Sequence, residues 1–161
     1  MEIREYRKSD WDEVWGILRS VFKEGDTFPN HVDTSEEEAR CYWIEKPAHT
    51  FVALNDGKVI GSYHLKNNQM GLGSHVANAG YVVSPFARGS GVGFRLATHS
   101  LKYAVELGYK AMQFNLVVCT NLPSLQLWEK LDFQIVGTLP CAFNHSKKGL
   151  VDAYVLYKWL V

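Results

Sequence analysis

The chain has 161 residues, enough for one folded domain with its own core and a ligand pocket, but too few for a second domain of ordinary size. Its 17 Lys and Arg residues balance its 17 Asp and Glu residues, so no strong net field would attract nucleic acid or an anionic membrane surface. Three cysteines without paired spacing, a charged N-terminus and the lack of a long apolar run predict a cytoplasmic protein without disulfides.

The first third of the sequence predicts a strand followed by two helices. Residues 3–6 form the strand, and Ser9 with Asp12 fits a capping box before the first helix. Apolar residues then recur at helical spacing: Trp11, Val14, Trp15, Leu18 and Phe22. After a break that contains glycine and proline, Thr34 and Glu37 fit the cap of a second helix. Its apolar side carries Ala39, Tyr42, Trp43 and Ile44.

The middle third predicts three strands. Residues 50–54 and 58–65 are rich in β-formers and are separated by Asn55-Asp56-Gly57, a strong hairpin signal. A third β-type segment runs over residues 75–84 and leads directly into a glycine-rich loop. That loop opens a helix, which Gly108 ends.

The last third predicts a strand, a helix and two further strands. The strand covers residues 111–118 and the helix residues 121–131, while residues 133–136 and 151–159 form the closing strands. Residues 139–149 are interpreted as an irregular loop. The predicted order is therefore βααβββαβαββ, which indicates one mixed α/β domain.

The glycine-rich loop is the clearest candidate for a binding motif: Arg88-Gly89-Ser90-Gly91-Val92-Gly93. Its glycines allow a tight turn, and the unpaired N–H groups at the start of the following helix suit a pyrophosphate, next to the cation of Arg88. The spacing is neither GxGxxG nor a P-loop, which excludes the Rossmann and Walker interpretations. A plain strand-to-helix turn stays open as an alternative for the glycines alone.

These residues resemble the GNAT superfamily of N-acetyltransferases. The acetyl-CoA motif V-x-P-x-x-R-G-x-G-x-G/A is matched by Val83, Pro85, Arg88, Gly89, Gly91 and Gly93. A second signature, N-x-x-A/S-x-x-L-Y-x-x-x-G-F, is matched by Asn121, Ser124, Leu127 and Phe133. Trp128 and Asp132 depart from it, where the family has Tyr and Gly. The resemblance implies a GNAT fold over residues 1–161, with a mostly antiparallel, mixed sheet of about seven strands.

In that fold helices cover both faces of the sheet, and the fourth and fifth strands splay apart at the reaction centre. Residues 75–81, 112–118 and 151–154 also look like a subfamily that includes acetyltransferases of proline analogues such as azetidine-2-carboxylate. The resemblance thus implies transfer of the acetyl group of acetyl-CoA to the amino group of a small amine, amino acid or imino acid. No cluster with metal-ligand spacing is present, and no metal is expected.

The resemblance also assigns the cofactor contacts. The implied residues are Tyr81, Val82, Val83, Arg88, Gly89, Ser90, Gly91, Val92, Gly93, Asn121, Ser124 and Trp128. The strand end at residues 81–83 would pair with the pantetheine arm, and a β-bulge at Gly80 would free an N–H for the oxyanion. Asn121 is equally an ordinary N-cap, and Trp128 an ordinary core side chain. Because Trp128 replaces the usual acid, water or Ser124 would protonate the thiolate.

Asn78, Tyr81 and His75 are the predicted catalytic residues, and Asn78, Asn115 and His145 the predicted substrate contacts. Asn78 and Asn115 stand in otherwise apolar strands, where a buried amide needs partners; they serve either the acceptor or the irregular backbone. For the general base His75, His145, Asp152 and a water chain all stay open.

Two other functions remain as alternatives: acetylation of protein N-termini or lysines, and an inactive acyl-CoA-binding sensor. Neither nucleic acid nor a membrane is expected as a partner, because the chain is neutral and lacks an apolar span. The aromatic residues of the last strand, Tyr154, Tyr157 and Trp159, suit either a core or the interface of a homodimer.

Overall fold

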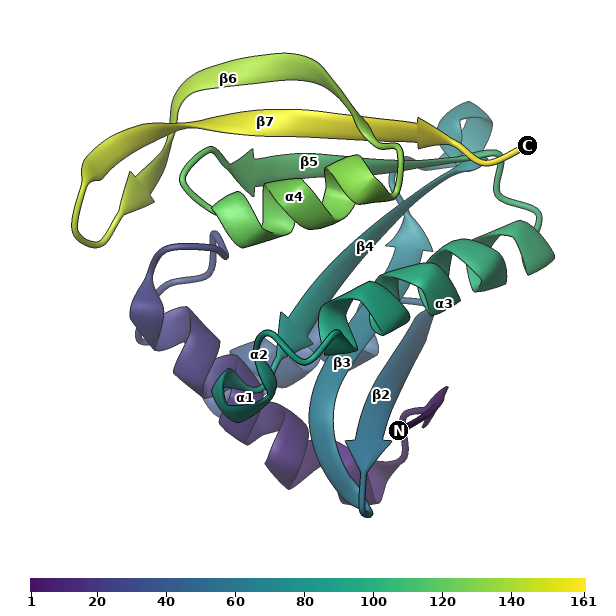
Figure 1. Cartoon of the computed structure of the whole chain (residues 1–161), viewed down its shortest axis with the longest axis vertical. Helices are drawn as coiled ribbons and strands as arrows, with labels where there is room; N and C mark the ends of the chain where they lie inside the picture. The colour runs from purple at the N-terminus through teal and green to yellow at the C-terminus, as the bar shows by residue number, and fades with distance from the viewer.

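The computed structural model describes residues 1–161, with seven strands and four α-helices in the predicted order (Figure 1). The strands are β1 Glu2–Glu5, β2 His49–Asn55, β3 Lys58–Asn67, β4 Val76–Val83, β5 Ala111–Val118, β6 Gln134–His145 and β7 Gly149–Trp159. The helices are α1 Trp11–Glu24, α2 Glu36–Arg40, α3 Val92–Glu106 and α4 Leu122–Lys130. The succession βααβββαβαββ is therefore confirmed.

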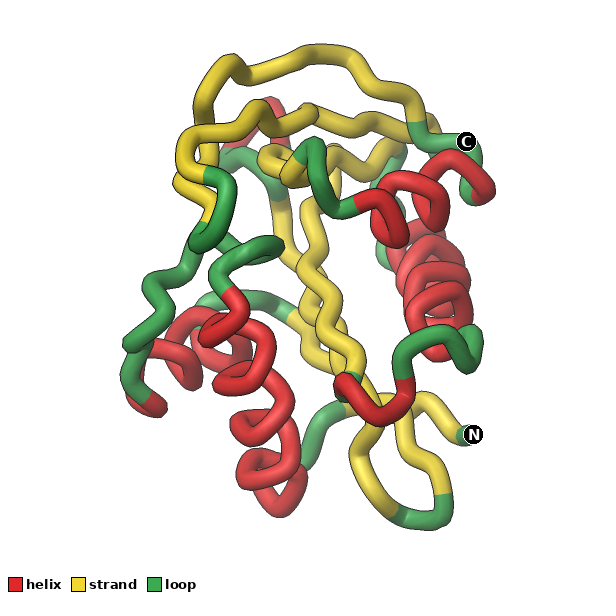
Figure 2. The backbone as a smooth tube through the Cα atoms, turned by 60° about the vertical axis from the view of Figure 1, so that its left-hand side comes forward, coloured by secondary structure: helices red, strands yellow, loops and turns green.

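All strands belong to one sheet of order β1-β2-β3-β4-β5-β7-β6. Neighbouring strands are antiparallel except β4 and β5, which are parallel. Helices lie on both sides of the strands (Figure 2). Each side has its own core, because side chains alternate between the two faces of a strand: Val52 of β2 packs with α1, whereas its neighbours Phe51 and Ala53 pack with α3. The predicted mixed sheet with two covered faces is confirmed.

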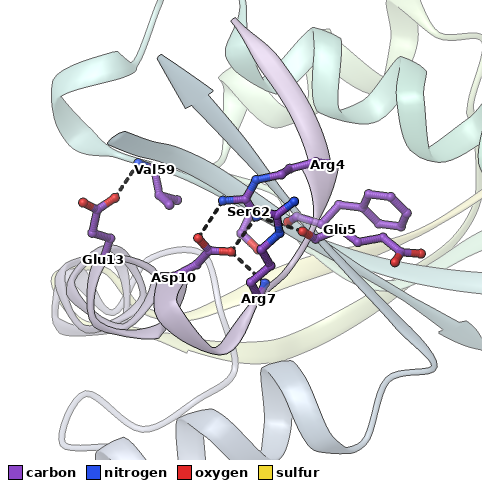
Figure 3. A network of polar contacts seen from close by, with 8 residues as sticks. Arg4, Glu5, Arg7, Asp10, Glu13, Val59 and Ser62 are labelled. Carbon is purple, nitrogen blue, oxygen red and sulfur yellow. Dashed lines mark hydrogen bonds and ion pairs between the residues drawn. The ribbon is translucent and has the colours of Figure 1, made fainter. Parts of the chain in front are cut away.

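The β1–α1 junction is held by one carboxylate, that of Asp10 (Figure 3). Both its oxygens accept hydrogen bonds from the Arg4 guanidinium at 2.8 Å, and one also accepts from the Arg7 amide at 2.7 Å. The bond to Arg4 lowers the pKa of Asp10 below its usual value. Asp10 is the N-cap residue of α1 by position, without a side-chain bond to the helix, and the predicted capping box of Ser9 and Asp12 is wrong.

Further contacts fix α1 over the sheet and position the segment that follows it. The Glu13 carboxylate accepts from the Val59 amide at the start of β3 (Figure 3). Gly25 ends α1 at φ +62°, a left-handed conformation that favours glycine. The turn between β6 and β7 reaches this end: the Ser146 amide donates to the Gly25 carbonyl at 2.9 Å, and its hydroxyl donates to the Glu24 carbonyl at 2.7 Å.

The cap of α2 lies one residue beyond the predicted pair. Ser35 and Glu38 form the capping box, whereas the Thr34 hydroxyl donates to the His31 carbonyl at 2.6 Å. After one turn α2 continues as a π-helix over Cys41–Glu45. The π-helix buries Trp43 completely, and the indole N–H donates to the Ser62 hydroxyl on β3 at 2.9 Å. This places the Cys41–Glu45 segment directly against the central strands.

The predicted loop over residues 139–149 is wrong. β6 continues through this stretch to His145 and pairs with β7 up to His145–Gly149. The register shifts between Leu139 and Phe143, where Cys141 has φ +51°. A bulge thus absorbs the irregular sequence while the long antiparallel partner keeps the strand. The predicted β2–β3 hairpin is confirmed. None of the helices has the length and apolar composition needed to cross a membrane.

Candidate active site

The site begins where β4 and β5 separate. The two strands pair only at Val76–Ala111 and Ala77–Met112, after which they diverge (Figure 1). On their other edges β4 stays paired with β3, and β5 with β7. The predicted splay between the fourth and fifth strands is confirmed, and its strand edges face a cleft instead of each other.

The cleft has a volume of about 300 Å³. Three strands (β3, β4 and β5), the helix α4 with its cap and the segment between α1 and β2 provide its walls. Its lining residues include Thr27, Tyr42, His64, Lys66, Asn78, Gly80, Tyr81, Phe114, Asn115, Asn121, Ser124 and Trp128. The walls contain no Asp or Glu, and Lys66 is their only permanent cation.

The glycine-rich loop lies between the end of β4 and the start of α3. Gly89 has φ +78° and Gly91 φ +82°, so both need glycine for their backbone conformation. Gly93 lies inside α3, where a Cβ would only make ordinary contacts of 3.7 Å and 3.8 Å with Leu127 and Val83. The first helical bond runs from the Arg95 amide to the Gly91 carbonyl, so the amides of residues 92–94 have no helical partner.

Three side chains of the loop have structural partners. The Arg88 guanidinium contacts both carboxylate oxygens of Glu24 at 3.0 Å, which ties the loop to the end of α1. The exposed Ser90 donates from its hydroxyl to the Ala87 carbonyl at 2.6 Å. Val92 is buried and anchors the first turn of α3 in the core. The backbone amides at the start of α3 thus remain available to an anion.

Asn121, Ser124 and Trp128 form a chain of hydrogen bonds along α4. The Asn121 side-chain oxygen accepts from the Ser124 amide at 3.3 Å, which makes Asn121 the N-cap. The Trp128 indole donates to the Ser124 hydroxyl at 2.9 Å. Trp128 is buried, with its ring centroid 4.4 Å from that of Phe114. Its N–H is thus already used, whereas the Ser124 hydroxyl keeps its own proton for another acceptor.

The two strand asparagines have different partners. The side-chain amide of Asn78 donates to the Gln113 backbone carbonyl at 2.9 Å and so bridges β4 and β5 just beyond their last paired residues. Asn115 donates to the Asn68 side chain at 2.8 Å and accepts from the Gln113 side chain at 2.9 Å. Both line the cleft. Asn78 thus satisfies the irregular backbone at the splay, as one of the two interpretations expected.

Tyr81 points toward α3 from the edge of the cleft. Its hydroxyl lies 2.6 Å from the Ser100 hydroxyl, and burial raises the pKa of the phenol. Residues 81–83 remain in register with β3, opposite Tyr63, Ser62 and Gly61. Their edge toward β5 has no strand partner. The backbone of this segment is therefore available to a ligand, while the Tyr81 hydroxyl is engaged in the core.

The structure does not bring the three predicted base candidates to the cleft. His75 is exposed at the closed end of the splay, with Nδ1 3.2 Å from the Leu72 carbonyl. His145 is buried in β6 and accepts from the Lys147 amide at 3.1 Å. Asp152 accepts from the Cys141 amide at 2.9 Å. Each is held by a residue close to it in the β-sheet or turn and none lines the cleft.

His64 lines the cleft instead, and sequence reasoning missed it. It is 1% exposed, and neither ring nitrogen has a hydrogen-bond partner. Burial, with a smaller effect of Lys66, lowers the pKa of His64 to about 3. A signal was present: Ser62, His64 and Lys66 put three polar groups in succession on one face of a strand that helices cover.

Gly80 explains how the imidazole fits. The expected β-bulge at Gly80 is wrong, because β3 and β4 keep a continuous register from Gly61–Val83 to Asn67–Ala77. His64 lies opposite Gly80, and a Cβ at residue 80 would stand 2.6 Å from His64 Nε2. Glycine is therefore required here to make room for the ring rather than to bend the strand.

Comparisons with known proteins agree with this geometry. A model of the Acetyltransferase (GNAT) family matches residues 11–133. N-acetyltransferase aca1 of Schizosaccharomyces pombe is 40% identical over 98 residues, which are 60% of this chain and 47% of that protein. The chain thus spans about half the length of this curated relative.

Solved structures share the whole fold. A GCN5-related N-acetyltransferase from Kribbella flavida is 35% identical with a TM-score of 0.94, over 99% of this chain and 97% of that one. YncA of Salmonella typhimurium, described with its cofactor acetyl-CoA, is 20% identical with a TM-score of 0.83, over 100% of this chain and 94% of that one. The family match covers most of the chain and includes both walls of the splay, so this chain belongs to the acetyltransferase (GNAT) family.

Proposed function

We propose that residues 1–161 form one acetyltransferase domain, which transfers the acetyl group of acetyl-CoA to the amino group of a small molecule in a ternary complex. The observation that carries this proposal is the cleft between β4 and β5, which begins beside unpaired strand backbone and whose β4 wall leads along the chain to the amide-rich start of α3. Family membership supports the chemistry, and the position of the cleft supports these residues as its site.

On the cofactor side, the amides at residues 91–94 would hold the pyrophosphate at the start of α3. Because Arg88 is paired with Glu24, we infer that backbone groups rather than this guanidinium make most of the contacts with the pyrophosphate. The open edge of residues 81–83 would bond the pantetheine arm as an added strand. Asn121 and Ser124 would contact the arm from α4, with Trp128 as the apolar floor between them.

Acetyl-CoA supplies the acetyl group and a thiolate leaving group. The Ser124 hydroxyl is oriented by the Trp128 indole and has a proton to donate, which makes it the candidate acid in place of the usual tyrosine. Asn78 and Asn115 would contact the acceptor at the splay. Such contacts place the amine close to the reacting carbon, where orientation alone accelerates the reaction strongly.

We infer a small acceptor, with amino acids and cyclic imino acids such as azetidine-2-carboxylate as first candidates. A cleft of about 300 Å³ is at the small end of ligand pockets and must hold part of the cofactor as well. Lys66 would suit an acceptor carboxylate, and the absence of acidic lining residues disfavours a basic peptide.

Calorimetry with acetyl-CoA, followed by thiol release over a panel of amino acids, imino acids, polyamines and peptides, tests the proposal. We expect micromolar binding and turnover with amino or imino acids. Turnover with peptides alone would instead support a protein acetyltransferase, and binding without any turnover a sensor. No association between folded protein and acetyl-CoA would overturn all three.

A further inference from the structure

The His64 imidazole has no structural explanation within the protein itself. It is 1% exposed, and both ring nitrogens lack a hydrogen-bond partner. Two aromatic rings stand nearly perpendicular to it: the ring centroids of Trp43 and Tyr42 lie 4.6 Å and 5.6 Å away. Buried polar groups are nearly always paired, so an unpaired imidazole indicates a partner that binds there.

The geometry places this ring at the wall of the cleft. His64 shares a strand face with Lys66 and lies opposite Gly80, whose missing Cβ leaves room for Nε2. The Thr27 hydroxyl, which covers the same cleft from the segment after α1, is also buried without a partner. Two unpaired polar groups from distant segments thus line one cavity, beside the splay.

The charges around the cleft assign a role to the ring. Lys66 and the phenols of Tyr42 and Tyr81 are the other titratable groups of the lining. An ammonium group and phenols whose pKa burial raises do not accept a proton at neutral pH. Burial and Lys66 keep the imidazole neutral, with a pKa of about 3, so one nitrogen retains its lone pair at pH 7.

We propose that His64 is a catalytic residue that accepts a hydrogen bond from the amine nitrogen of the acceptor and takes the proton which that nitrogen loses during transfer. This rests on the proposed function. The nitrogen lone pair forms the C–N bond to the acetyl carbon, the C–S bond breaks, and its electron pair leaves with sulfur. The proton passes from nitrogen to His64 and then to solvent, while the thiolate takes one proton from solvent, either directly or relayed through the Ser124 hydroxyl, which is reprotonated by solvent.

A weak base is adequate for this step. An ammonium ion far more basic than His64 would not give up its proton to the ring, so the acceptor must enter as the free amine. The N–H becomes acidic only as the C–N bond forms, and the neutral ring can then receive the proton. Until that point the hydrogen bond directs the nitrogen lone pair, which contributes through orientation.

The test compares His64→Phe and His64→Gln with the wild type. Phe keeps a flat aromatic ring but has no nitrogen, so the variant should melt about 2–6 °C higher because an unpaired buried group is removed. Its kcat should nevertheless fall about a hundredfold, with the Kd of acetyl-CoA unchanged. Gln can still accept a hydrogen bond but has no basic nitrogen. The KM for the amine substrate should therefore be closer to wild type in His64→Gln than in His64→Phe, while kcat stays low.

Gly80→Ala provides an independent variant that does not alter the His64 residue itself. Its methyl group would stand 2.6 Å from Nε2 and must displace the ring, so the acceptor KM should rise at least about fivefold while acetyl-CoA affinity is retained. His31→Phe, at an exposed imidazole outside the cleft, is the matched control and should behave as wild type.

The outcomes separate this inference from the proposed function. A wild type that binds acetyl-CoA and acetylates an amine, together with a His64→Phe variant whose kcat stays within twofold, would overturn the role of His64 alone. A wild type that neither binds acetyl-CoA nor acetylates any amine of the panel would overturn both. A His64→Phe variant that is more stable and almost inactive would support both.

Discussion

On the side proposed for the cofactor, the groups available to a ligand come from two short continuous stretches: residues 88–94, beyond the end of β4, and residues 121–128 of α4 and its cap. On the opposite side they come from β3, β4 and the segment between α1 and β2, far apart in the chain. The first side presents mainly backbone amides and capped helix starts, whereas the second presents an imidazole, an ammonium group and amides. A nucleotide-like cofactor can thus be held by local structure, while acceptor recognition depends on tertiary packing.

This contrast predicts different results for substitutions on the two sides. Substitutions on the cofactor side should change folding or acetyl-CoA affinity, because the same residues build helix starts. Substitutions on the acceptor side should change turnover with little loss of stability, and at His64 even with a gain.

The largest effect on stability is expected for Trp128→Ala. Removing a buried indole that packs on Tyr81, Phe114 and Phe133 should lower the free energy of unfolding by about 3–5 kcal/mol. Urea denaturation measures this change. Trp128→Phe, which keeps most of the packing, should lose about 1–2 kcal/mol, and equal losses in both variants would contradict a packing role.

The pH dependence of stability isolates His64. Its pKa is about 3 in the folded protein against 6.5 as its ordinary value, so the unfolded chain binds the additional proton and lowering the pH through this window favours unfolding. Between pH 6.5 and pH 4.5 the wild type should lose about 2–3 kcal/mol more than His64→Phe. The lowered pKa of Asp10 acts alike in both proteins and cancels. Parallel curves of unfolding free energy against pH would contradict a buried, neutral imidazole.

On the cofactor side, Gly91→Ala should be worse than Gly93→Ala. Gly91 has φ +82°, which costs a non-glycine residue about 1–2 kcal/mol, although no atom lies within 4 Å of the added Cβ. Gly93 has a helical conformation and room for a Cβ, so alanine there should be neutral or slightly stabilising. Acetyl-CoA affinity measured by calorimetry should fall at least about fivefold for Gly91→Ala only. Similar affinities in both variants would show that strain in the loop does not determine how tightly acetyl-CoA binds.

The smallest effect is expected for Glu24→Gln. This half-exposed ion pair with Arg88 should contribute less than about 1 kcal/mol to stability. Freeing the guanidinium should leave acetyl-CoA affinity within about threefold of wild type, because backbone amides supply the grip. A tenfold gain in affinity would instead show that Arg88 is a phosphate ligand held back by Glu24.

The cap of α2 illustrates how far prediction from sequence reached. The segment Thr34-Ser35-Glu36-Glu37-Glu38 contains two overlapping S/T-x-x-E patterns, so composition favours a helix start but not one register. Thr34 is instead bonded to the His31 carbonyl in the preceding turn, which leaves Ser35 as the cap. The β6 strand differs from the predicted loop over residues 139–149 for a related reason, since pairing with β7 overrides a locally irregular sequence.

Periodicity, turn residues and the glycine loop by themselves determined the order of elements, the hairpin at Asp56-Gly57 and the helix that follows the glycine loop, because these features arise from neighbouring residues. Only the tertiary structure decided which polar side chains meet in the cleft. His64 and Gly80 stand 16 positions apart, and their fit depends on strand register and on the helices that exclude water. Local patterns encode backbone conformation, but burial and unpaired polar atoms exist only once distant segments pack together.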